Sequence, residues 1–299
     1  MLIDGGNVDD SSKIFTILKN SGIDKLDIVV GTHAHEDHIG GLASALNYAT
    51  ADLVLCNVED YNSKAFSSFK KYADLNGGDI VVPNVGDTYS LGSATVEILS
   101  CSSEYSNDSI VLVVRYGDNS FLFTGDMERE SEIVLCERYS DEYPIDLLKV
   151  GHHGSDTSSS YRFIRMLMPE YAVISVGENN NYGHPTDAVL SRLSDADVKT
   201  YRTDLNGDIY AYSDGHNITI ETAKEAGEDE IFKPADVAKN EEYTTESTGD
   251  AQAYVLNTKT MKFHYPSCSG LPTKNRADIT ETRDELIAKG YSPCGICKP

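Results

Sequence analysis

Residues 31–41 of the chain read Gly-Thr-His-Ala-His-Glu-Asp-His-Ile-Gly-Gly and directly follow the strand-like run Asp27–Val30. Three histidines and one aspartate fall within six residues of this stretch, namely His33, His35, Asp37 and His38. On a tight loop, side chains at positions i and i+2 can face one metal ion while those at i+4 and i+5 face another. Imidazole suits zinc, iron or manganese, and a neighbouring carboxylate suits an open hydrolytic site. The stretch therefore predicts a two-metal site rather than a solvated polar loop.

Three later predicted strands also end in polar groups. Asp126 follows the run Phe121–Phe123, and His152 and His153 follow the run Leu147–Val150. Two adjacent imidazoles are hard to explain structurally, because burying both without partners is unfavourable. His184 lies in a loop after a further predicted strand, 171–175. Helical and strand patterns alternate along the chain, so we expect layers of helix and sheet.

The pattern His-x-His-x-Asp-His is the signature of the metallo-β-lactamase superfamily of binuclear hydrolases. The segments 2–6, 124–126, 149–155 and 182–185 further resemble the soluble hydrolase domain of ComEC-type competence proteins. This similarity runs from Leu2 to about Thr222. The resemblance implies an α/β fold, an αββα sandwich of two mixed sheets with helices outside. It also implies one or two N-terminal strands ahead of Leu2.

The resemblance implies roles for the polar groups at the strand ends. Two divalent ions, Zn²⁺ or Mn²⁺, would share a hydroxide that attacks a phosphorus or carbonyl centre. The metal ligands would be His33, His35, Asp37, His38, Asp126 and His153, with Asp126 bridging both ions. Asp37 would also hold the hydroxide, and His152 would face the substrate, although the sequence alone does not separate His152 from His153. His184 would be a late ligand, a contact to a phosphoryl oxygen or the proton donor to the leaving group.

One departure from the superfamily pattern concerns the first metal. Many members carry a histidine ahead of the strand that precedes the bridging aspartate, where this chain has Tyr-Ser-Asn-Asp-Ser at residues 105–109. Asn107 or Asp108 would then stand in for the histidine or orient a water. A site with weaker nitrogen donation favours manganese or empties readily. The β-lactam-hydrolysing branch is correspondingly disfavoured.

Length and composition bound the domain count and the partners. At 299 residues, with 40% hydrophobic residues, the chain can bury one large domain plus a small one. No apolar run reaches membrane-spanning length, and residues 2–6 read as a strand and turn rather than as a signal peptide. The net charge of −23 disfavours loose binding to nucleic acid or anionic lipid. No protein partner can be inferred.

The charge is uneven and marks three regions. Residues 251–299 carry a local charge of +3, which leaves the first 250 residues at −26. We expect a hydrolase domain over 1–222, an acidic flexible linker over 223–252, and a second module over 253–299. In the linker, Ile231 and Phe232 are candidates to dock on the domain.

The C-terminal module has the ligand pattern of a structural zinc site. His264 and Cys268 are followed by Cys294 and Cys297, with a predicted hairpin before them and a predicted helix, 282–289, between the pairs. A module of this size needs such a ligand to hold its fold, and four ligands of this kind match one structural Zn²⁺. Two free thiols near a surface histidine are the alternative.

The amino-acid sequence around Cys268 and over residues 293–299 resembles that of the zinc module of Ada-type DNA-repair proteins. Those proteins have a cysteine, the methyl acceptor, at the position of His264, so methyl transfer is not expected here. Contact with nucleic acid through the positive charge of the module is what the resemblance implies.

These observations predict a metal-dependent hydrolase, specifically a phosphodiesterase or nuclease acting on DNA in competence-type DNA uptake. A small-molecule phosphoesterase, for example one acting on cell-wall phosphocholine, is the first alternative, and the −26 charge of the first 250 residues favours it. A non-catalytic binding protein with a zinc tail is the second, against which the complete ligand set argues. ComEC-type hydrolases lie outside the cytoplasmic membrane, which favours a secreted or cell-surface location.

Overall fold

The structure is a computed structural model that describes residues 1–234, 252–258, 262–266, 271, 276–281, 286, 289 and 291–293 of the chain. It divides into two compact units, Met1–Ala238 and Lys239–Pro299. A search of the described helices for one of membrane-spanning length and hydropathy finds none.

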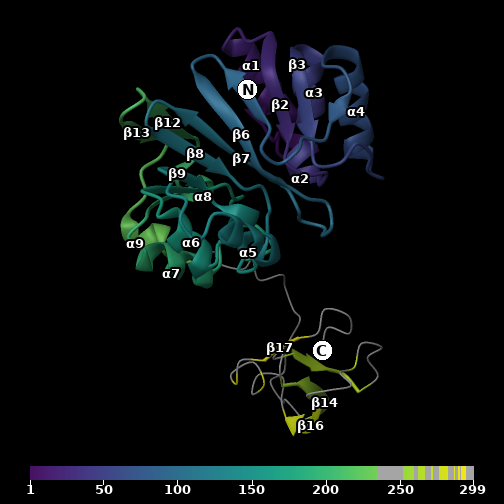
Figure 1. Ribbon diagram of the computed structural model, residues 1–299, viewed down its shortest axis with the longest axis vertical. Coiled ribbons are helices and arrows are strands. Elements are labelled where there is room, and N and C mark those ends of the chain that lie inside the picture. The colour runs from purple at the N-terminus through teal and green to yellow at the C-terminus, as the bar shows by residue number, and fades with distance from the viewer. Residues whose placement is uncertain are drawn as a thin grey trace. The chain divides into compact units, whose positions relative to one another are not determined.

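Two β-sheets lie face to face at the centre of the first unit (Figure 1). The first sheet is parallel, with the order β1 (Leu2–Ile3), β2 (Lys25–Gly31), β3 (Thr50–Cys56) and β4 (Ile80–Val81). The second sheet is mixed, with the order β11 (Lys199–Arg202), β10 (Tyr171–Ile174), β9 (Leu147–Lys149), β8 (Asn119–Phe123), β7 (Ile110–Tyr116), β6 (Ala94–Cys101) and β5 (Thr88–Leu91). A separate hairpin joins β12 (Ile209–Ser213) and β13 (Ile218–Thr222).

Helices cover the outer face of each sheet (Figure 1). The first sheet carries α1 (Ser11–Asn20), α3 (Leu42–Tyr48) and α4 (Lys64–Asn76), and the second carries α5 (Arg129–Arg138), α6 (Tyr161–Leu167) and α7 (Asp187–Asp195). Shorter helical segments are η1 (Val8–Asp10), α2 (Glu36–Ile39), η2 (Gly151–Gly154), α8 (Thr203–Asn206) and α9 (Glu228–Ile231). The predicted αββα sandwich is thus confirmed.

Strand β2 shows how the sequence builds these layers. Its side chains point alternately to the two faces of the sheet, as they do in any strand. Ile28 and Val30 pack against Ile98 and Ile110 of the second sheet, whereas Val29 packs under the helices. An almost unbroken apolar run is what a strand buried on both faces requires.

The sheet topology brings the polar strand ends together. Strands β8, β9 and β10 are parallel neighbours, so the loops after them leave the sheet at one edge. The loop after β2 reaches the same edge from the first sheet, because the Ile110 amide at the start of β7 donates to the Thr32 carbonyl at 2.8 Å. The two sheets are therefore joined by a hydrogen bond beside the histidine loop.

The first unit extends beyond the boundary expected at residue 222. The segment 223–234 packs on the domain, where Ile231 is buried and Phe232 contacts the core under α6 and α7. The guanidinium of Arg202 also donates to the carbonyls of Ile231 and Lys233. Residues 223–234 of the expected linker are thus held by apolar burial and hydrogen bonds. Residues 235–251 lie outside the described residues, and Gln252 begins β14 (Gln252–Asn257) of the second unit.

The second unit contains a sheet of β16 (Arg276–Glu281), β14 (Gln252–Asn257), β15 (Lys262–His264) and β17 (Ser292–Pro293), in that order. The predicted hairpin is confirmed, because β14 and β15 pair antiparallel. His264 is buried, and its Nδ1 makes no hydrogen bond within the described residues. Three of the four predicted zinc ligands, Cys268, Cys294 and Cys297, lie outside the described residues, as does most of the predicted helix 282–289.

Candidate active site

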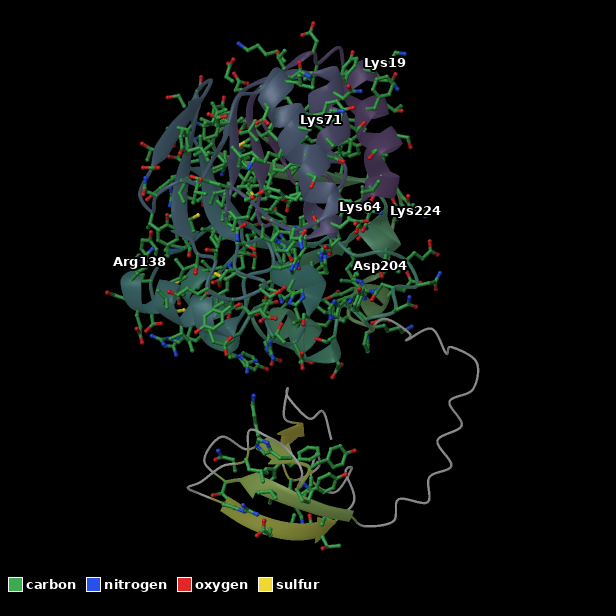
Figure 2. The ribbon with its side chains drawn as sticks, turned by 90° about the vertical axis from the view of Figure 1, so that its right-hand side faces the viewer. Lys19, Lys64, Lys71, Arg138, Asp204 and Lys224 are labelled. Atoms are coloured by element: carbon green, nitrogen blue, oxygen red, sulfur yellow. The ribbon has the colours of Figure 1, made fainter. Side chains whose placement is uncertain are left out.

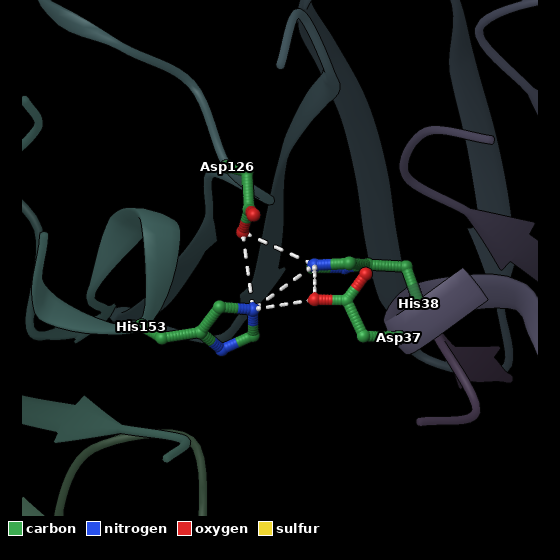
Figure 3. A group of neighbouring side chains, drawn as sticks. All are labelled: Asp37, His38, Asp126 and His153. Atoms are coloured by element: carbon green, nitrogen blue, oxygen red, sulfur yellow. Dashed lines mark hydrogen bonds and ion pairs between the residues drawn. The ribbon is translucent and has the colours of Figure 1, made fainter. Parts of the chain in front are cut away.

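Four of the predicted ligands converge at the edge where the two sheets meet (Figure 3). Asp37, His38, Asp126 and His153 each offer one ligand atom, and these atoms all lie within 4.8 Å of one another. His38 Nε2 lies 3.1 Å from Asp126 Oδ1 and 3.3 Å from His153 Nε2, and His153 Nε2 lies 3.3 Å from Asp37 Oδ2. Asp37 and His38 lie on α2, which follows β2 of the first sheet, whereas Asp126 follows β8 and His153 follows β9 of the second sheet.

The glycines after the histidine loop explain how this geometry forms locally. Helix α2 begins after His35, whose carbonyl accepts the amides of His38 and Ile39. A Cβ on Gly41 would lie 2.1 Å from the carbonyl oxygen of Gly5, so only glycine fits there. This close approach lets the Gly5 amide donate to the His38 carbonyl at 2.6 Å, which places the loop after β1 beside the histidines.

Asp4, for which the sequence analysis predicts no role, orients His38. Its Oδ2 lies 2.7 Å from His38 Nδ1, while its two oxygens accept the amide and hydroxyl of Thr32. Burial lowers the pKa of His38, but the carboxylates of Asp4 and Asp126 outweigh burial and raise it to about 10. A carboxylate on one ring nitrogen directs the other nitrogen to a metal, as in many metal sites. The signal in the sequence was an aspartate directly after a strand.

Asp126 supplies the observation that tests whether a metal fits. It is 3% exposed, and its Oδ1 makes no hydrogen bond within the described residues although two imidazole nitrogens face it. Burial raises the pKa of Asp126, but the contact with His38 and the nearby imidazoles together lower it well below its usual range. A buried carboxylate oxygen that has no hydrogen bond within the described residues and faces imidazole nitrogens belongs to the donor set that zinc or manganese takes. The residues present therefore fit a divalent ion.

His152 and His153 are separated by their contacts. His153 Nδ1 lies 2.8 Å from the Ser175 carbonyl, which leaves Nε2 for the cluster of four. His152 Nδ1 instead faces Thr157 Oγ1 at 3.0 Å and Glu128 Oε1 at 3.2 Å, and its Nε2 lies 3.8 Å from Asp126 Oδ2. Both residues have positive φ, 47° and 53°, a conformation that strains non-glycine residues and gathers at functional sites.

His33 and His35 form a second group beside the cluster of four. His33 Nε2 lies 3.0 Å from His35 Nδ1, and the rings of His33 and His38 are 4.2 Å apart. Burial and the neighbouring His38 lower the pKa of His33 to about 4. The structure thus brings both predicted pairs to one place, although His33 and His35 are not members of the tight cluster.

The predicted substitutes for the missing histidine do not face this group. Asp108 is 3% exposed, and its carboxylate accepts from the Ser102 and Ser131 hydroxyls and from two backbone amides of its own loop. The side-chain Nδ2 of Asn107 donates to Glu128 Oε1 at 3.0 Å. Two hydroxyls of segment 105–109 do face the histidines. Ser106 Oγ lies 3.2 Å from His35 Nε2, and Ser109 Oγ lies 3.4 Å from His33 Nδ1 and accepts the Asp126 amide at 3.0 Å. The sequence prediction missed both serines.

A hollow of about 820 Å³ opens onto the cluster. Asp37 and His153 lie in its wall together with the predicted catalytic residue His184. Its rim includes Asp204 and Lys224, both labelled in Figure 2. Six carboxylates and two lysines line it, so the entrance is acidic: Asp10, Glu36, Asp37, Glu178, Asp204 and Asp208, with Lys13 and Lys224.

The fold and the histidine loop agree with a comparison against protein families. The family model described as "Metallo-beta-lactamase superfamily" matches residues 1–178. The chain belongs to the metallo-β-lactamase superfamily. Members of this superfamily hold divalent metal ions and share the fold of metal-dependent hydrolases. The cluster of Asp37, His38, Asp126 and His153 fits such an ion.

Relatives of this superfamily member include proteins of competence and recombination. The chain is 32% identical over 204 residues to ComE operon protein 3 of Bacillus subtilis, covering 67% of this chain and 26% of that protein. It is 32% identical over 212 residues to Competence protein ComA of Neisseria gonorrhoeae, covering 69% and 28%. The chain thus spans about a quarter of the length of these relatives, and the similarity supports a ComEC-like hydrolase domain.

A comparison with solved structures finds partial matches of low identity. The metallo-β-lactamase fold protein YhfI of Bacillus subtilis has a TM-score of 0.43 and 14% identity, covering 67% of this chain and 81% of that one. A diphosphatase of the PhnP family has a TM-score of 0.35 and 18% identity, covering 67% of each chain.

Proposed function

We propose that the domain hydrolyses phosphodiester bonds, with DNA as the substrate, at a site for two divalent ions, Zn²⁺ or Mn²⁺. The observation that carries the proposal is the cluster of Asp37, His38, Asp126 and His153, with a buried carboxylate oxygen that has no hydrogen-bond partner within the described residues. When bound, such ions acidify a water and stabilise the oxygen that gains charge during hydrolysis.

The residues divide this work by their positions. Asp37, His38, Asp126 and His153 would hold one ion, and His33, His35 and Asp126 would hold the other. The Asp37 side chain is 43% exposed and faces the hollow, so it can also orient the attacking water. His152 and His184, whose rings are 5.8 Å apart, would contact the phosphoryl oxygens or the leaving group from the substrate side.

Two observations bear on which phosphodiester is cleaved. The names of the relatives refer to competence and recombination, processes in which DNA is handled, which favours DNA. The acidic lining of the hollow favours a small phosphoester instead, because a long polyanion is repelled by carboxylates. Small-molecule phosphoester hydrolysis is therefore the second candidate.

The test uses the full chain loaded with Mn²⁺ or Zn²⁺ and three substrates: single-stranded DNA, plasmid DNA and bis(p-nitrophenyl) phosphate. We expect all three to be hydrolysed, and EDTA or the substitution D126N to abolish hydrolysis. D24N, which changes an exposed aspartate, is the matched control and should behave as the wild type. Turnover of the small ester alone would support the second candidate, and turnover of none would overturn both.

We also propose that His264, Cys268, Cys294 and Cys297 hold one structural Zn²⁺. Within the described residues the Nδ1 of His264 is buried and has no hydrogen-bond partner, which supports this proposal because a bound ion would occupy that nitrogen. The test is the zinc content per chain of the wild type and of C294S. Loss of one equivalent is expected, and equal zinc content in both proteins would contradict the site.

A further inference from the structure

Three aromatic rings form a row that leads away from the metal cluster. His152 lies beside Asp126, and the His184 ring meets the His152 ring edge to face at 5.8 Å and 72°. Tyr182 in turn stacks on His184. The centroids of these two rings are 5.8 Å apart and the interplanar angle is 25°. This aromatic row of His152, His184 and Tyr182 ends in a tyrosine that is 81% exposed.

The loop that carries the outer two rings is held in place by one side chain. Asn180 Oδ1 accepts the amides of Tyr182 at 3.2 Å and His184 at 3.0 Å, and its Nδ2 donates to the His184 carbonyl at 2.6 Å. The Thr186 amide donates to the Gly154 carbonyl at 2.9 Å, which fixes this loop against the turn of His152 and His153. The exposed ring is therefore pre-positioned relative to the cluster.

The aromatic row also borders the space that a substrate would enter. Tyr182 and His184 lie in the wall of the same 820 Å³ hollow as Asp37 and His153. A flat, exposed ring at a fixed place beside a reaction centre is a stacking surface, and every nucleobase has a face that can stack on it. Stacking does not depend on positive charge, so it suits a hollow lined mainly by carboxylates.

We propose that Tyr182 stacks a nucleobase of single-stranded DNA next to the phosphodiester that is cleaved. The inference rests on the proposed function and specifies that the DNA substrate is single-stranded. In a duplex, each base is already stacked and paired, so a base has to leave the helix before it can reach Tyr182. The domain should therefore act on single strands in preference to duplexes.

The experiment measures kcat and KM of the Mn²⁺-loaded full chain on a single-stranded oligonucleotide and on an abasic strand of equal length. Y182A should raise KM for the oligonucleotide by about 5- to 150-fold with kcat unchanged, the range that base–aromatic stacking supplies. Y182F keeps the ring and should keep the wild-type KM. Neither substitution should change KM for the abasic strand, because that strand has no base to stack.

The matched control is Y212A, since Tyr212 is also exposed (53%) but is not among the residues lining the hollow. Y212A should retain the wild-type KM. Because Tyr182 is exposed, Y182A should keep the wild-type unfolding midpoint, which separates binding from folding. A Y182A protein with the wild-type KM for the oligonucleotide, or with an equal loss on the abasic strand, would overturn the inference.

Two further substrates separate the inference from its alternatives. An exposed tyrosine in an acidic hollow can also bind a quaternary ammonium group. A Y182A effect confined to p-nitrophenyl phosphorylcholine would therefore overturn base stacking in favour of that group. Wild-type turnover of single-stranded and plasmid DNA tests the proposed function alone: absence of both ends the proposed function, whereas turnover of the oligonucleotide with no Y182A effect ends only the inference.

Discussion

Asp4 Oδ2 lies 2.7 Å from Nδ1 of His38, across 34 positions of sequence, and thereby fixes the direction of the opposite ring nitrogen. The contact exists because β1 and β2 are parallel neighbours, so the residue after β1 lies beside the loop after β2. A carboxylate in this position makes the imidazole a better ligand and holds its orientation.

Replacing this carboxylate should weaken metal binding without removing a ligand. We expect D4N to lower the affinity for Zn²⁺ or Mn²⁺ by about 10- to 100-fold, the usual effect of losing a partner behind a ligand. Competition with a chromogenic chelator measures the affinity. D52N, which breaks an exposed ion pair with Lys25, is the control. Equal affinities of D4N and wild type would show that Asp4 does not orient His38.

The close approach of Gly41 to Gly5 predicts a large effect from one methyl group. In G41A the new Cβ would lie 2.1 Å from the Gly5 carbonyl oxygen, so the backbone has to move. We expect the free energy of unfolding to fall by about 1–3 kcal/mol or more, as in other overpacked sites. Urea denaturation measures it, with G177A as the control, since a Cβ there meets nothing within 4 Å. A G41A protein as stable as G177A would contradict the close packing.

Asp108 should prove to be structural rather than a ligand. D108A removes an acceptor of four hydrogen bonds in a buried position, so the free energy of unfolding should fall by about 2–4 kcal/mol. The metal content per folded chain should stay at the wild-type value, as it should in the exposed-site control D79A. Loss of one metal equivalent in D108A alone would mean that Asp108 does replace the missing histidine.

Glu132 predicts a pH dependence of stability. It is 1% exposed and accepts the amides of Ser159 and Ser160; burial nevertheless raises its pKa. A carboxyl whose pKa is higher in the folded state favours folding below its unfolded pKa, about 4.3, and this contribution is lost as pH rises through the folded pKa. The unfolding free energy of wild type relative to E132Q should therefore fall as the pH rises above about 4.3. A constant or rising difference, measured by urea denaturation, would contradict the raised pKa.

Local sequence patterns predicted much of the fold. The apolar run of β2 was confirmed. The sequence patterns also predict helices over residues 42–48, 61–75 and 127–138. The first is confirmed as α3, whereas α4 begins three residues and α5 two residues later than predicted. Helices α6 and α7 were not predicted, because each is short and follows a polar loop. Strand β11 was missed because its residues, Lys-Thr-Tyr-Arg, show no apolar alternation: the buried positions are Thr200 and Arg202.

The site was predictable where ligands follow one another in sequence or end a strand. His33, His35, Asp37 and His38 could be grouped from spacing alone. The contacts of Asp4 and Ser109 could not, because they depend on strand pairing and on the packing of two sheets. The candidate role of Asp108 as a substitute for the histidine depends on the folded structure in the same way. Its carboxylate accepts four hydrogen bonds from groups that only the folded chain brings to it.

Of the four clustered side chains, Asp37 and His38 follow β2 of the first sheet, whereas Asp126 and His153 follow strands of the second sheet. An ion held by all four side chains would cross-link the two layers. Its affinity would therefore depend on the two sheets being packed as they are in the folded domain. Each tenfold excess of ion over its dissociation constant would then add about 1.4 kcal/mol to the free energy of unfolding of the domain. Chelation should remove this stabilisation from both layers together.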